Sequence, residues 1–142
     1  KKNRLPILAG GVAGTATAVF SILGMCRLFG LDSQLTISLL PKSVTTPIAT
    51  AISQGQGGIT AVTVAAVCFT GIMGNLCAPL LMKLFRVKDP VAAGLAIGAC
   101  SHAVGTAKAL ELGETEGAMS GLAIGLCGII TTIFALFFQF FV

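Results

Sequence analysis

The side chains that could do chemistry in this sequence gather in two short blocks, "PKSVTTPIA" at 41–49 and "SHAVGTAKA" at 101–109. Both blocks interrupt long apolar runs, and hydroxyl side chains occur in each of them. Lys42 lies in the first block and His102 in the second. Because ammonium, imidazole and hydroxyl groups can all donate hydrogen bonds, the two blocks together predict a binding site for a small anion such as a carboxylate.

Each block also carries signals for the start of a helix. Thr46 before Pro47 predicts a threonine N-cap followed by proline at the first helical position. Thr106 precedes "AKALEL", a run of helix formers that Gly113 ends. We therefore expect two half-helices whose N-termini, with free N–H groups and partial positive charge, point toward the membrane centre. The predicted substrate-binding residues are Lys42, Ser43, Thr45, Thr46, Ser101, His102, Thr106 and Lys108.

Structural explanations compete with this interpretation for the charged residues. Lys42 could extend its ammonium to the membrane interface, and His102 could be buried with a backbone carbonyl as its partner. Lys108 could pair with Glu111 or Glu114 on a helix surface. Ionisable groups within membrane spans are nevertheless functional candidates, because burying them there costs free energy.

The composition is that of an integral membrane protein. The 142 residues have a mean hydropathy of +0.97 and only 10% are charged, against about 25% in a soluble domain. The basic runs at 1–4 and 83–89 are too sparse to predict nucleic-acid binding. Five scattered cysteines without a CxxC pair indicate small core residues rather than a disulfide framework or metal site. With no catalytic constellation in the sequence, we expect neither an enzyme nor a cofactor.

The apolar segments set the expected topology. Segments 5–29, 59–82 and 117–142 can each supply the ~20 residues that a transmembrane helix needs. Segments 35–53 and 91–112 are similar in length but broken by polar residues, Gly or Pro. If both basic runs lie in the cytoplasm, each broken segment must enter the membrane and turn back, where protein or a water-filled cavity covers its irregular backbone. Two kinked helices that cross fully are the alternative, and they would place one basic run outside.

Small residues at fourth positions predict close helix packing. Gly10 and Gly14 form one pair, and Gly117, Gly121 and Gly125 form a run. Such faces allow helix backbones to approach closely in lipid.

A shift of 60 positions reveals a partial internal repeat centred on the two broken segments. Lys42 aligns with His102, and Thr60 aligns with Ser120. We predict an all-α membrane domain over 1–142 with inverted repeat units at about 32–82 and 90–142, the plan of many secondary transporters. The identical pairs are Leu35 with Leu95, Ile37 with Ile97, Val44 with Val104, Thr46 with Thr106, Ala49 with Ala109, and Gly57 with Gly117.

Over residues 39–130 the sequence resembles the LrgB/CidB membrane-protein family. The resemblance rests on "LLPKSVTTPIATAIS", "FTGIMG", "APLL" and "AAGLAIGACSHAVGTAKALELGETEGAMSGLA", while "GNLCAP" at 74–79 departs from a more glycine-rich stretch. Full members of that family are longer, so the chain resembles their C-terminal portion. Because it also begins without Met, we expect a fragment that lacks upstream membrane segments.

The resemblance implies two kinds of function. Bacterial members are described as holin or antiholin-like proteins that modulate murein hydrolase export and cell lysis. Related proteins include the plastid glycolate/glycerate translocator and bacterial proteins of pyruvate uptake. A holin does not need opposed polar half-helices, so we favour a secondary transporter of small carboxylates with an unidentified coupling ion. The expected setting is the bacterial cytoplasmic membrane, as a multi-pass homo-oligomer that can also bind a small partner membrane protein.

Overall fold

The computed structural model describes residues 4–140, and every regular element in that range is a helix, as the sequence predicted. Four helices are long and apolar enough to cross a membrane by length and composition. The chain is therefore a multi-pass membrane protein. Its elements are α1 (Arg4–Leu28), α2 (Ser33–Leu39), α3 (Thr46–Gly55), α4 (Thr60–Leu84), α5 (Pro90–Leu112), α6 (Glu114–Ala135) and the 3-10 helix η1 (Phe138–Phe140).

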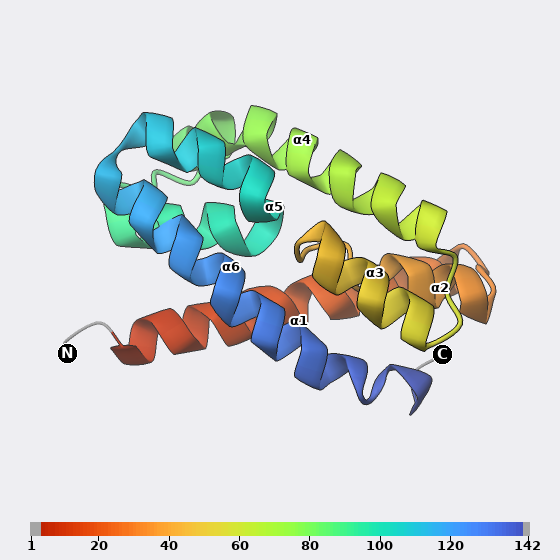
Figure 1. Cartoon of the computed structure of the whole chain (residues 1–142). Helices are drawn as coiled ribbons and strands as arrows, with labels where there is room; N and C mark the ends of the chain where they lie inside the picture. The colour runs from red at the N-terminus through yellow and green to blue at the C-terminus, as the bar shows by residue number, and fades with distance from the viewer. Residues whose placement is uncertain (1–3, 141–142) are drawn as a thin grey trace.

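Helices α2 and α3 form a hairpin, hairpin 1, that turns back on itself. The Asp32 side chain starts α2 by accepting a hydrogen bond from the Leu35 N–H (2.7 Å). The two helices have 7 and 10 residues, too few to cross a ~30 Å hydrocarbon core at about 1.5 Å per residue. Figure 1 shows that α2 begins and α3 ends at the same end of the molecule, with residues 40–45 as the tip between them.

Helix α5 is a second hairpin, hairpin 2, although its 23 residues satisfy the length of a transmembrane helix. His102 has non-helical angles (φ 44°, ψ −138°) and divides the helix into arms 90–101 and 103–112. Ile97 on the first arm packs in one cluster with Ala109 on the second. Figure 1 shows α5 beginning and ending at one end of the molecule. The structure therefore has the predicted turn-back, not a kinked helix that crosses fully.

The two hairpins enter from opposite ends of the molecule, and their tips meet near its middle (Figure 1). Contacts that join each hairpin to the following long helix recur at the predicted offset of 60. The Thr63 hydroxyl on α4 donates to the Ser38 carbonyl on α2 (2.9 Å). The equivalent pair, Gly98 and Ala123, is also in close contact between α5 and α6. The arrangement is that of an inverted repeat, whose bounds at about 32–82 and 90–142 stay a prediction.

Glycines bring α5 close to α1 and α6. A Cβ at Gly10 would lie 2.7 Å from Leu95, and one at Gly14 would lie 3.5 Å from Ala99, so this α1 face packs on α5 as predicted. The predicted glycine run on α6 does not provide a close helix contact along its length, because Gly121 and Gly125 face open space. The close approach to α6 comes from α5, where a Cβ at Gly98 would collide with the Ser120 backbone. The Gly94/Gly98 pair was not singled out from the sequence.

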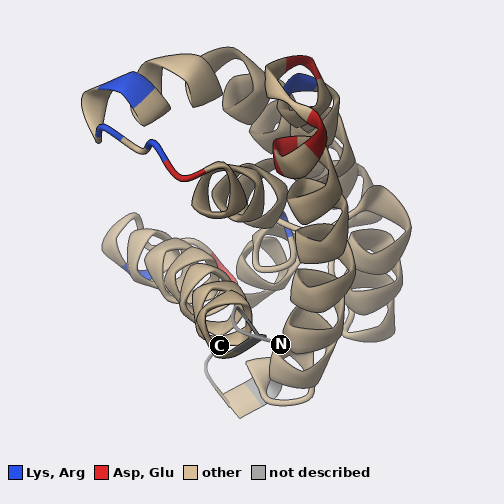
Figure 2. Cartoon of the chain, turned by 90° about the vertical axis from the view of Figure 1, so that its left-hand side faces the viewer, with Lys and Arg blue, Asp and Glu red and all other residues tan. Residues whose placement is uncertain are grey.

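Charged residues lie mainly at one end of the molecule. Figure 2 looks onto this end, where loops carry both basic and acidic residues. Lys83, Arg86 and Lys88 belong to it, and in Figure 1 the segment after α4 lies at the same end as the start of α1. Since short loops rich in Lys and Arg stay in the cytoplasm, we expect this end on the cytoplasmic side and the turn after α3 on the opposite side.

This orientation predicts the outcome of cysteine labelling. In a variant without native cysteines, Gln54→Cys and Lys88→Cys introduce thiols at two exposed positions. A membrane-impermeant maleimide should label position 54 in intact cells and position 88 only after permeabilisation, a difference of at least tenfold in rate. Labelling of both positions from the same side would contradict the hairpin topology.

Candidate functional site

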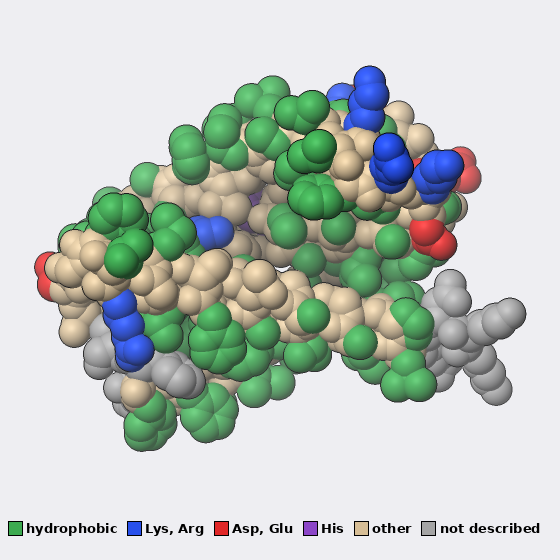
Figure 3. Space-filling view, turned by 180° about the vertical axis from the view of Figure 1, so that it is seen from behind, with side chains coloured by type: hydrophobic (Ala, Val, Ile, Leu, Met, Phe, Trp, Pro, Cys, Tyr) green, Lys and Arg blue, Asp and Glu red, His purple; other side chains and the backbone are tan. Residues whose placement is uncertain are grey.

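The tips of both hairpins border an open groove of about 810 Å³ that runs along α4. Hairpin 1 contributes Leu39 and Lys42, and hairpin 2 contributes Cys100 and Ser101. The remaining walls, from α1 and α4, are mostly apolar. Figure 3 shows one basic side chain in this hollow, midway along the molecule and beside the histidine, far from the charged ends. The structure therefore brings Lys42 and Ser101 to one cavity, as the sequence predicted.

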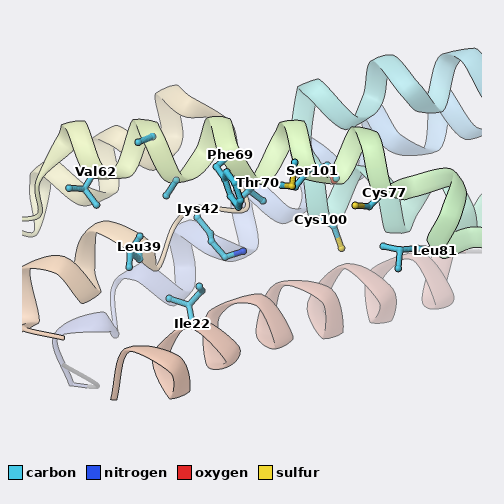
Figure 4. A pocket seen from close by; sticks show the side chains of 14 residues that line it. Ile22, Leu39, Lys42, Val62, Phe69, Thr70, Cys77, Leu81, Cys100 and Ser101 are labelled. Atoms are coloured by element: carbon cyan, nitrogen blue, oxygen red, sulfur yellow. The ribbon is translucent and has the colours of Figure 1, made fainter. Parts of the chain in front are cut away.

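Lys42 is the charged group of this groove. Figure 4 shows its side chain extending from the tip of hairpin 1 toward Cys100. Its Nζ donates to the Ser43 hydroxyl at 3.3 Å, and no carboxylate among residues 4–140 forms an ion pair with it. An ammonium group at membrane depth is costly without a partner of opposite charge. The site can therefore attract a small anion.

The hydroxyls of hairpin 1 divide between different roles. Ser43 borders a small enclosed cavity on the α1 and α6 side of the tip. The N-cap of α3 is Thr45 rather than the predicted Thr46, and its side chain makes no capping hydrogen bond. The predicted side-chain cap is therefore wrong. No side chain caps the first turn of α3, and Pro47 has no N–H to satisfy there. The N-terminus of α3 therefore keeps its partial positive charge beside the tip of hairpin 1.

His102 is an anchor of hairpin 2 rather than a wall of the groove. The residue is only 4% exposed, and its Nε2 lies 3.0 Å from the Val67 carbonyl on α4. Since a carbonyl can only accept, Nε2 carries the proton. Gly71 on α4 makes room for the ring, because a Cβ there would lie 2.8 Å from His102 Cε1. The structural explanation, a buried histidine with a backbone carbonyl partner, describes what this ring does.

Thr106 and Lys108 do not take the roles predicted for them. Thr106 lies one turn inside the second arm, where its hydroxyl bonds the His102 carbonyl (2.9 Å) and the Ser120 hydroxyl (2.7 Å). It therefore does not cap a helix, and it faces α6 rather than Thr46. Lys108, which is half-buried, forms an ion pair with the exposed Glu111 (2.6 Å) one turn further along the helix. The position of Thr106 follows from the different lengths of the two hairpin tips. A single residue, His102, interrupts α5, whereas six residues separate α2 from α3.

Four residues near the hairpin tips were missed by the sequence reasoning. Thr70 and Cys100 border the groove, and Thr15 and Thr131 border the small cavity beside Ser43. Three of them belong to long apolar helices, where a single threonine is unremarkable, and Cys100 belongs to a run of small residues. The signal that the sequence offers for these residues is their polarity within an apolar span. Polarity alone does not show which neighbouring element a helix face contacts.

Replacement of Thr106 should cost stability. Thr106→Val leaves the Ser120 hydroxyl, 0% exposed, without its partner, and an unsatisfied buried donor costs about 1–3 kcal/mol. We expect a lower melting temperature in detergent for Thr106→Val than for Thr46→Val. Thermal unfolding followed by circular dichroism measures this difference. Equal melting temperatures for the two variants would show that the Thr106–Ser120 contact contributes nothing.

Comparisons with known proteins add a family context. The sequence matches the family model described as "LrgB-like family" over residues 1–140. It is 40% identical over 133 residues to the uncharacterized protein YxaC of Bacillus subtilis strain 168, covering 94% of this chain and 58% of that protein. It is 39% identical, with the same coverage, to the antiholin-like protein LrgB of Bacillus cereus strain B4264 and of Bacillus anthracis strain CDC 684. No solved structure matches. The chain thus spans 58% of the length of these curated relatives.

Proposed function

The chain belongs to the LrgB-like family, and from that premise we propose that it is part of a secondary transporter of small carboxylates, with the anion bound between the tips of two opposed hairpins. The observation that carries this proposal is the Lys42 ammonium, which borders the groove without an ion-pair partner among the described residues. An inverted pair of hairpins with a site at their meeting point is the plan of many secondary transporters.

The contacts suit a carboxylate of two or three carbons. Lys42 supplies the charge, and a charge-assisted hydrogen bond is about twice as strong as a neutral one. Ser101 borders the same groove from hairpin 2, so its hydroxyl can bond a second oxygen of the substrate. The mostly apolar walls make the surroundings of such a pair less polar than water, which strengthens it. Glycolate, glycerate and pyruvate are the substrates that we propose.

The course of the groove also suggests how the binding site could open alternately to the two sides of the membrane. It extends along α4 from Val62 near one end of that helix to Leu81 near the other. Lys42 lies between these ends, at the hairpin tips (Figure 4). Movement of one tip relative to α4 would open the site to one side and close it to the other. The coupling ion, a homo-oligomeric state and a small partner membrane protein are further parts of this proposal, as is the bacterial cytoplasmic membrane.

A second candidate is a holin or antiholin-like regulator of murein hydrolase export and cell lysis, and the names of the relatives favour this class. The two candidates differ in what crosses the membrane. A transporter saturates with substrate and discriminates among acids of equal charge. A lesion-forming protein passes solutes with little selectivity.

Uptake into proteoliposomes that contain the full-length protein distinguishes the two. Labelled glycolate, glycerate and pyruvate are supplied one at a time, with unlabelled acids as competitors and an encapsulated dye as a reporter of leakage. We expect saturable uptake of at least one acid and no loss of dye. Dye release above a threshold protein density, without saturable uptake, would favour the holin-like alternative.

A further inference from the structure

A small enclosed cavity lies behind the tip of hairpin 1, on the side away from the groove. It has a volume of about 10 Å³, which is room for about one water-sized group. Helix α1 borders it with Thr15, hairpin 1 with Ser43, and α6 with Cys127 and Thr131. Ala99 of hairpin 2 also borders it. The cavity therefore lies where both hairpin tips meet the two long helices α1 and α6.

One polar atom in this cavity lacks a partner. Thr15 is 3% exposed, and its Oγ1 makes no hydrogen bond within the described residues. The neighbouring Cys127 thiol interacts with it, but a thiol is only a weak donor and acceptor. A buried hydroxyl without a partner destabilises a protein, and valine would have the same shape without that cost. The unpartnered hydroxyl therefore points to a ligand.

The surrounding groups decide which ligand is suitable. Thr15, Ser43 and Thr131 present hydroxyl side chains, and the Lys42 ammonium donates to the Ser43 hydroxyl. No acidic side chain borders the cavity. The ammonium opposes a metal cation at this place, because like charges repel. Hydroxyl donors beside an ammonium group instead suit one oxygen of an anion.

We propose that Thr15, Ser43 and Thr131 form an occluded subsite for one carboxylate oxygen of the substrate, which the Lys42 ammonium delivers from the groove. This inference rests on the proposed function. Lys42 borders the groove and Ser43 borders the cavity, and their contact at 3.3 Å is long for a charged hydrogen bond. A carboxylate that displaces it can therefore bond Lys42 and the hydroxyls at once.

The test compares Thr15→Val and Thr131→Val with Thr132→Val. Thr132 is the matched control, since its hydroxyl already donates to the Gly128 carbonyl (2.9 Å). In proteoliposomes with labelled pyruvate, glycolate or glycerate, whichever is transported, we expect Thr15→Val and Thr131→Val to raise KM at least fivefold. Thr132→Val should change KM less than twofold. Without substrate, Thr15→Val should melt at the same temperature as the parent protein or a higher one.

The outcomes separate this inference from the proposed function. If the parent protein takes up none of the three acids, the proposed function fails. If uptake occurs and depends on Lys42, but Thr15→Val and Thr131→Val keep the parental KM, only the subsite is overturned and the cavity holds water. A Thr15→Val variant that melts well below the parent would also overturn the subsite, because the hydroxyl would then be structural.

Discussion

Lys42→Met is expected to reduce carboxylate uptake by about 10-fold to 150-fold, because a hydrogen bond to a charged group contributes about 1.5–3 kcal/mol. Methionine keeps an unbranched side chain of nearly the same length along the groove and removes the charge and its donors. Because Lys42 has no ion-pair partner among residues 4–140, its loss leaves no carboxylate unpaired. The variant should therefore fold and assemble as the parent protein does, with an equal or higher melting temperature.

Initial rates of uptake in proteoliposomes measure this effect. Lys108→Met is the matched control, because that half-buried lysine pairs with the exposed Glu111 away from the groove. We expect the control to keep parental uptake within about twofold, since exposed ion pairs contribute about 0–1 kcal/mol. Lys42→Arg should retain part of the uptake, because guanidinium keeps the charge but not the compact shape of ammonium. Parental uptake by Lys42→Met would remove the basis of the proposed site.

Much of the fold could be predicted because lipid imposes simple rules on the sequence. The length of the apolar segments predicted the long helices α1, α4 and α6. The polar block with two prolines predicted the tip of hairpin 1. Hydropathy alone would have made α5 a crossing helix, since its 23 residues satisfy the rule. The turn there was indicated by the two basic runs, if both lie in the cytoplasm, and by the internal repeat, which aligns Lys42 with His102.

The site was harder to predict, because its residues depend on helix rotation and on the geometry of each tip. Lys42 and Ser101 do border one groove. Sequence spacing made Thr46 and Thr106 equivalent caps, but a one-residue break places Thr106 inside the second arm, where it bonds α6. Thr15 escaped notice because nothing in an apolar helix shows which side a threonine faces.

His102→Ala is expected to lower the turnover rate at least tenfold while KM changes less than threefold, because this residue positions hairpin 2 and does not border the groove. Its positive φ of 44° is unfavourable for any residue with a Cβ and costs about 1–3 kcal/mol. The hydrogen bond to the Val67 carbonyl and the packing of the ring hold this conformation against α4. Alanine keeps the strain and loses both compensating contacts, so the tip should lose its defined position.

Two further variants identify the cause of that loss. His102→Gln places an amide N–H near the position of Nε2 and should recover part of the turnover. Gly71→Ala leaves His102 intact but puts a methyl group 2.8 Å from Cε1 of its ring, so it should reproduce the defect from the opposite helix. Gly125→Ala, which faces open space, is the control and should be neutral. If His102→Ala raised KM and left turnover unchanged, the imidazole would bind substrate itself and the anchoring role would be wrong.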